Sequence, residues 1–71
     1  MTTVRLTGNW RNPSKMEWGG APEVDDQGKI ERTVALPAGV YEKIEEAIGK
    51  QQTQGSINLG AGQRVDWFLD R

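Results

Sequence analysis

A single helical stripe constrains the fold of this chain more than any other feature. Apolar side chains recur at Val40, Ile44, Ala47 and Ile48, which places them on one face of a helix over about residues 38–51. The other patterned stretches alternate between apolar and polar residues, as strands with one buried face do. One amphipathic helix needs a sheet to cover. We therefore predict an α+β fold in which this helix packs on one face of a small antiparallel sheet of about four or five strands.

Alternation predicts two strands near the N-terminus. Within residues 2–10, Val4, Leu6 and Trp10 share one parity, so a half-buried strand is expected with these three side chains in the core. A turn containing Asn, Pro and Ser follows. Residues 16–18 can then return as a short strand, which the next Gly and Pro residues end.

A further strand is predicted over residues 29–36, after a turn of sequence Asp-Asp-Gln-Gly. Ile30, Val34 and Leu36 share one face of it, and Arg32 interrupts that face. A charged residue there is compatible with an edge strand or a bulge. It is equally compatible with a long side chain whose stem covers apolar surface while its head reaches water.

The C-terminal part is typical of a β-hairpin. Strands are expected over residues 56–59 and 63–70, joined by the three residues Gly60, Ala61 and Gly62. In the second strand, Val65, Trp67 and Leu69 face one way. The opposite, polar face carries Arg64, Asp66, Phe68 and Asp70.

The composition limits both stability and chemistry. The chain has 71 residues, with no cysteine and no histidine. We expect one domain over residues 1–71, and a domain this short gains little net stability without a disulfide, a structural metal, a very dense core or a partner chain. The same two absences exclude thiol chemistry and a histidine base. We therefore expect a protein that is not an enzyme and holds no metal or cofactor.

The charge gives no strong preference for a charged partner. Nine basic and ten acidic residues leave a net charge of −1, so no global field attracts nucleic acid or an anionic membrane. No apolar stretch is long enough to cross a bilayer, and the first six residues lack the apolar core of a signal peptide. A cytoplasmic location with no membrane association is the default expectation.

Two aromatic residues are candidates for contact with a protein partner. Trp18 lies in a loop-like segment between Glu17 and two glycines, and we expect its ring to be exposed, whereas Trp10 continues the buried parity. Phe68 lies on the polar face of the terminal strand, beside Arg64 and Asp66. If that strand is a sheet edge, Phe68 could anchor a second chain through strand pairing. The alternative is that Trp18 is an ordinary core residue and Phe68 an ordinary exposed aromatic residue.

Nucleic-acid binding is the main alternative function. A small hydrolase, which would need two acidic residues gathered in one pocket, is a third hypothesis. Arg5, Arg11 and Lys15 lie near Trp18 in the sequence, and aromatic rings beside basic groups can stack on bases.

A second observation bears on the same alternative. The sequence Arg-Thr-Val-Ala-Leu-Pro at 32–37, followed by Val40, Ile44 and Ala47, resembles the strand and first helix of ribbon-helix-helix DNA-binding proteins. The resemblance covers some twenty residues and implies a dimer that lays this strand in the major groove. The second helix of that family has no counterpart, and Glu31 on the groove-facing side would repel phosphate. We do not assign the chain to this family.

These observations favour a small, non-enzymatic protein–protein interaction module that acts as a homodimer. Trp18, Phe68, Arg64 and Asp66 are its expected contact residues. The size and the lack of catalytic residue types suit an accessory or inhibitor protein of the kind found in phages and other mobile elements.

Overall fold

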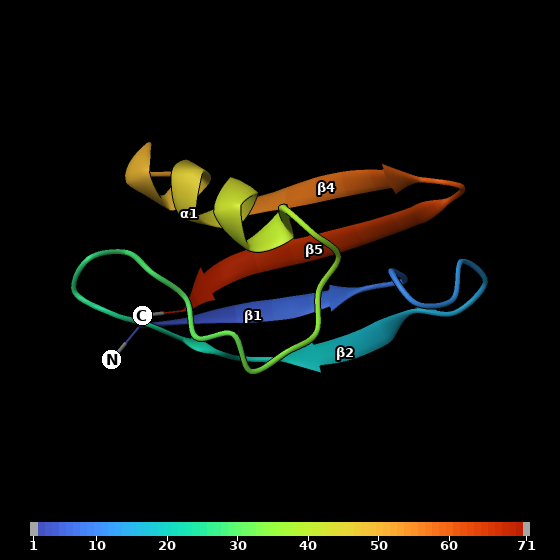
Figure 1. The fold of residues 1–71 in the computed structure, drawn as a ribbon, viewed down its shortest axis with the longest axis horizontal. Helices are drawn as coiled ribbons and strands as arrows, with labels where there is room; N and C mark the ends of the chain where they lie inside the picture. The colour runs from blue at the N-terminus through green and yellow to red at the C-terminus, as the bar shows by residue number, and fades with distance from the viewer. Residues whose placement is uncertain (1, 71) are drawn as a thin grey trace.

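The fold is an antiparallel sheet with one helix on it. The computed structural model describes residues 2–70. Its strands are β1 (Thr2–Gly8), β2 (Glu17–Gly20), β3 (Glu23–Val24), β4 (Gln54–Gly60) and β5 (Gln63–Asp70), and its helix is α1 (Val40–Gly49). The strand order is β2-β1-β5-β4, and β3 pairs with the start of β1 on the same side as β2. The predicted α+β architecture is confirmed (Figure 1).

The core lies between the sheet and the segments that cross its inner face. Figure 1 shows α1 in front of the β4–β5 half of the sheet, and the connection from β3 to α1 crossing in front of β1 and β2. The alternating residues of β1 and β5 and the stripe of α1 all point into this layer. The buried side chains of the core cluster are Val4, Leu6, Trp10, Ile30, Val40, Tyr41, Ile44, Val65 and Trp67.

The predicted strand over residues 29–36 is wrong. In this stretch only Ile30 makes a β-bridge, to Val24, and the adjacent Glu31 N–H donates to the Glu23 carbonyl of β3 at 3.0 Å. The remainder, residues 32–36, crosses the inner face without joining the sheet. The apolar side chains of the whole stretch still point into the core, because Ile30 is buried and Val34 and Leu36 pack against the buried cluster. The ribbon strand implied by the resemblance to ribbon-helix-helix proteins is therefore absent from this part of the chain.

Side chains of α1 replace the missing sheet partner of this segment. The Tyr41 hydroxyl accepts a hydrogen bond from the Val34 N–H at 3.1 Å and donates one to the Val34 carbonyl. Glu45 accepts the Ile30 N–H at 2.8 Å. Buried backbone groups need partners, and here the helix supplies them. The apolar alternation of residues 29–36 thus reports burial on one side but not strand pairing.

Arg32 takes the third of the arrangements considered for it. Its guanidinium carbon lies 4.3 Å from the centroid of the Tyr41 ring, and its side chain is about half exposed. One guanidinium nitrogen lies 3.3 Å from Glu45 and 3.9 Å from Glu42. The charge therefore stays at the surface while the side chain covers an aromatic ring.

The helix and the loop of the C-terminal hairpin are both shorter than predicted from the sequence. The helix occupies Val40–Gly49 within the expected span 38–51, and Gln51 just after it has a left-handed φ of 65°. The C-terminal hairpin has a two-residue loop instead of the expected three, because Gly60 pairs with Gln63. Ala61 and Gly62 in this loop have φ of 53° and 78°, as a type I′ turn requires.

The terminal strand is an internal strand, not a sheet edge. β5 pairs with β1 on one side and with β4 on the other, so both of its sides are occupied. The prediction that this strand could pair directly with a second chain is therefore wrong. The free edges belong to β4 and to the short strands β2 and β3. No helix within residues 2–70 is long and apolar enough to span a bilayer.

Candidate functional site

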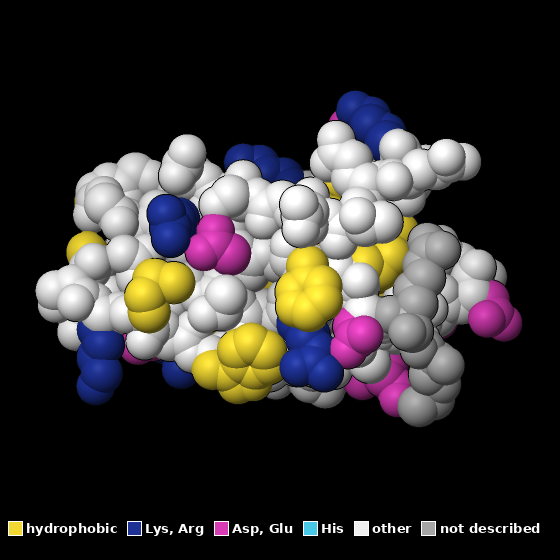
Figure 2. Space-filling model, turned by 180° about the vertical axis from the view of Figure 1, so that it is seen from behind, with side chains coloured by type: hydrophobic (Ala, Val, Ile, Leu, Met, Phe, Trp, Pro, Cys, Tyr) yellow, Lys and Arg dark blue, Asp and Glu magenta, His cyan; other side chains and the backbone are white. Residues whose placement is uncertain are grey.

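The sheet face opposite α1 is the candidate site, and we call it the open face. Strand alternation sends every second side chain of β1, β4 and β5 to this side, and Trp18 of β2 joins them opposite Thr7. Figure 2 views the molecule from this side and shows hydrophobic side chains near its centre beside basic and acidic ones. The open face consists of Thr3, Arg5, Thr7, Trp18, Gln54, Ser56, Asn58, Arg64, Asp66, Phe68 and Asp70.

Two exposed aromatic side chains line a shallow groove on the open face. The groove has a volume of about 490 Å³ and is lined by Trp18 and Phe68 together with polar residues such as Arg5, Asp66 and Gln54. Trp18 is 60% exposed and Phe68 is 44% exposed, although both are large apolar side chains. Exposed apolar side chains of this size in one groove are typical of a binding surface.

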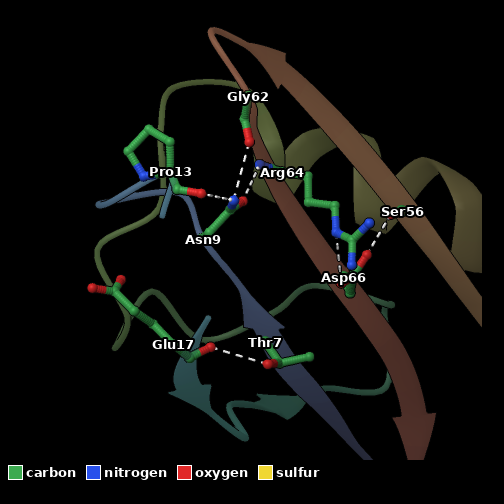
Figure 3. A network of polar contacts seen from close by, with 8 residues as sticks. All are labelled: Thr7, Asn9, Pro13, Glu17, Ser56, Gly62, Arg64 and Asp66. Atoms are coloured by element: carbon green, nitrogen blue, oxygen red, sulfur yellow. Dashed lines mark hydrogen bonds and ion pairs between the residues drawn. The ribbon is translucent and has the colours of Figure 1, made fainter. Parts of the chain in front are cut away.

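The register of the strands positions Trp18 beside the groove. Thr7 lies opposite both Trp18 of β2 and Asp66 of β5, and Asp66 lies opposite Ser56 of β4. These four residues form a row across the sheet. The Thr7 hydroxyl donates a hydrogen bond to the Glu17 carbonyl at 3.0 Å, which ties β2 to β1 beside Trp18 (Figure 3).

The charged side chains of the open face are paired with one another. The Arg5 Nε lies 2.8 Å from an Asp70 carboxylate oxygen, and its guanidinium carbon lies 5.9 Å from the Phe68 ring centroid. The Arg64 Nε lies 3.2 Å from Asp66, which also accepts a hydrogen bond from the Ser56 hydroxyl (Figure 3). The two arginines and two aspartates therefore form two ion pairs, and their charges cancel.

Asn9 fixes the end of the sheet next to the open face. Its side-chain amide donates to the carbonyls of Pro13 at 2.8 Å and Gly62 at 3.0 Å, and its oxygen accepts the Arg64 N–H at 2.8 Å (Figure 3). These bonds join the β1–β2 connection to the β4–β5 turn. Asn9 therefore fixes the Arg64 backbone relative to Pro13 and Gly62.

The structure brings together all four predicted partner-contact residues. Trp18, Phe68, Arg64 and Asp66 all lie on the open face, although the predicted reason for Phe68, an edge position, is wrong. Arg5, predicted as a nucleic-acid contact, lies on the same face and stacks against Phe68. Of the residues that line the groove, sequence reasoning missed Gly55 and three polar residues, Thr7, Gln54 and Ser56. The alternation of these polar residues could have indicated the face, but only the strand order shows that they adjoin Trp18 and Phe68.

The other two predicted nucleic-acid contacts lie outside the sheet. Arg11 and Lys15 are exposed in the connection between β1 and β2, and the Arg11 guanidinium carbon lies 5.8 Å from the Trp10 ring centroid. Between Thr2 and Asp70, no three acidic side chains are grouped in a way that could hold a metal ion. The chain matches no protein-family model, no curated protein and no solved structure.

Proposed function

We propose that this protein is a non-enzymatic binding module that contacts another protein through its open face. The observation that carries the proposal is the exposure of Trp18 and Phe68, which line one groove on the sheet face that the helix leaves free. Tryptophan and arginine are among the residues that contribute most to binding energy in protein interfaces. Arg5 beside Phe68 adds such an arginine to the centre of the face.

The charge pattern favours a protein partner over nucleic acid. Arg5 is engaged by Asp70 and Arg64 by Asp66, so carboxylates stand where a phosphate backbone would have to approach. Exposed aromatic rings beside paired charges resemble a protein interface, in which apolar and polar groups occur together. Arg11 and Lys15 could still contact a polyanion, and nucleic-acid binding therefore remains the second candidate function.

Binding without catalysis also agrees with the engagement of the ionisable groups. The carboxylates beside the groove, Asp66 and Asp70, each contact a guanidinium, and Asp66 also holds the Ser56 hydroxyl. These groups are arranged to fix the surface. A role as an accessory or inhibitor subunit, which acts by occupying a surface of another protein, fits such a module.

The experiment that tests this proposal is partner capture with open-face variants. The double variant Trp18→Ala/Phe68→Ala should stay folded and lose a partner that the wild-type chain captures by cross-linking in extracts of its native host. The control is Gln27→Ala/Lys43→Ala, which changes two exposed residues off the open face and should retain the partner. Retention of the same partner by the folded Trp18→Ala/Phe68→Ala variant would contradict the proposal.

Oligonucleotide titration distinguishes the second candidate function. Single- and double-stranded DNA and RNA at about 50 mM salt should show no binding, since phosphate contacts dominate such affinity at low salt. Binding that weakens steeply with salt, and that Arg11→Ala/Lys15→Ala abolishes, would replace the protein-binding proposal with a nucleic-acid one.

A further inference from the structure

We propose that two copies of this chain pair through their β4 strands, so that the two sheets become one continuous antiparallel sheet. The pairing uses the free backbone edge of β4, whose Gln54, Ser56 and Asn58 side chains also belong to the open face. The inference does not rest on the proposed function. It also differs from pairing through the terminal strand, which the internal position of β5 excludes.

The edge formed by β2 and β3 is protected against such pairing. These strands have only four and two residues, and each contains a glutamate, Glu17 and Glu23. The pairing of β1 with β2 is also irregular between Leu6 and Thr7. Short strands, charged residues and bulges are the features that natural sheets use to prevent edge-to-edge association.

The β4 edge has none of these protections over most of its length. It is seven residues long, with the sequence Gln-Gly-Ser-Ile-Asn-Leu-Gly, and contains no charged residue and no proline. Its pairing with β5 is regular from Gln54 to Asn58. Within residues 2–70, no strand pairs with its outer side, and β4 forms the upper border of the sheet in Figure 1. Such an edge is a template for another strand.

The backbone groups available for pairing follow from the register. The Leu69 N–H donates to the Thr53 carbonyl at 2.7 Å, just before β4 begins. Because backbone groups of an antiparallel strand alternate in direction, Gly55 and Ile57 then direct their N–H and C=O groups toward β5. Those of Gln54, Ser56 and Asn58 point to the free edge.

A second copy of β4 fits this edge. In the two-fold register centred on Ser56, Ser56 lies opposite itself, and Gln54 lies opposite Asn58 of the second copy. Each of these pairs can exchange two backbone hydrogen bonds. Because none of the three side chains is charged, the pairing places no like charges opposite each other, which would be destabilising.

The same register also buries apolar side chains on the inner face of β4. Ile57 and Leu59 are only partly buried although they pack against the core. In the register centred on Ser56, Ile57 lies opposite Gly55 of the second copy, where there is no side chain to obstruct it. A chain of 71 residues without disulfides gains stability from such burial. Pairing in the plane of the sheet leaves the open face free.

The first test is the oligomeric state of two variants at one position. Sedimentation equilibrium should give wild-type protein a mass twice that of one chain. Ser56→Pro should halve this mass, because proline removes an N–H that points out of the sheet and spares the hydrogen bonds to β5. Ser56→Ala removes the same hydroxyl contact with Asp66 and should remain dimeric. A monomeric wild type at about 1 mM, a concentration suited to weak association, would overturn the proposal.

The second test uses unmodified protein and therefore still tests the β4 pairing if Ser56→Pro does not fold. Amide hydrogen exchange should show Gln54, Ser56 and Asn58 protected at high protein concentration, with protection lost on dilution. Rapid exchange of these three amides at every concentration would contradict the pairing. The double variant Trp18→Ala/Phe68→Ala should remain dimeric, so failure of this proposal and failure of the proposed function give different results.

Discussion

Two of the three tryptophans are accommodated by a glycine on a neighbouring strand. A Cβ atom built on Gly19 would lie 2.5 Å from the Trp10 ring, and one built on Gly55 would lie 2.7 Å from Nε1 of Trp67. Trp67 follows the alternation of β5, and Trp10, two residues beyond the end of β1, continues that strand's buried parity, so the burial of both rings could be predicted from the sequence. The role of the glycines could not, because it depends on which strand lies beside each ring.

Substitution of these glycines tests this packing. Gly55→Ala should destabilise the fold by about 1–3 kcal/mol, the usual cost of overpacking, because the new methyl group meets the Trp67 ring. Gly49→Ala is the matched control, since a Cβ there meets no atom within 4 Å at the end of α1. It should stabilise the fold by about 0.5–1 kcal/mol through helix propensity. Urea denaturation measures both, and equal effects of the two changes would contradict the packing account.

The connection from β3 to α1 is a segment for which apolar alternation predicted the wrong secondary structure. Residues 29–36 have the composition and alternation of a strand, and their apolar side chains are correctly predicted to face the core. The segment is nevertheless not a strand, because Tyr41 and Glu45 of α1 bond its backbone at Val34 and Ile30. Alternation predicts which side chains are buried. A strand also needs a neighbouring strand whose backbone pairs with its N–H and C=O groups.

Removal of one hydroxyl tests this replacement of a strand by helix side chains. Tyr41→Phe keeps the buried ring but leaves the N–H and carbonyl of Val34 without their partner. The expected loss of stability is about 1–3 kcal/mol, the cost of an unsatisfied buried polar group. Hydrogen exchange at the Val34 amide should become faster, while exchange in β5 changes only in proportion to global stability. An unchanged Val34 amide would show that the hydroxyl does not hold this segment.

The β4–β5 turn gives a second prediction at this scale. Ala61 occupies a left-handed conformation in the two-residue loop, which costs energy for any residue with a Cβ. Ala61→Asn creates Asn-Gly, the preferred sequence for a type I′ turn, and should stabilise the fold by about 0.5–1 kcal/mol. Ala61→Val, which is β-branched, should have the opposite effect. Thermal unfolding measures both changes, and a lower melting temperature for Ala61→Asn would contradict the turn assignment.

At the scale of the whole molecule, the sheet has one covered face and one face that presents aromatic groups. The assignment of side chains to the two faces of β1 and β5 could be predicted, and so could the exposure of Trp18. The central position of β5 could not, because its pairing with β1 joins the two ends of the chain, as in Thr3 opposite Asp70. That pairing is what brings Phe68 and Arg5 together and adds them to the side of the sheet that carries Trp18.

Tryptophan fluorescence tests the two-faced arrangement most directly. Trp10 and Trp67 are 5% and 4% exposed, whereas Trp18 is mostly exposed, so acrylamide should quench one tryptophan strongly and two weakly. Trp18→Phe should remove the strongly quenched component and leave the unfolding free energy within about 0.5 kcal/mol of wild type, as for other surface changes. Trp67→Phe should leave that component in place. If Trp67→Phe or Trp10→Phe removed it instead, the assignment of the open face would be wrong.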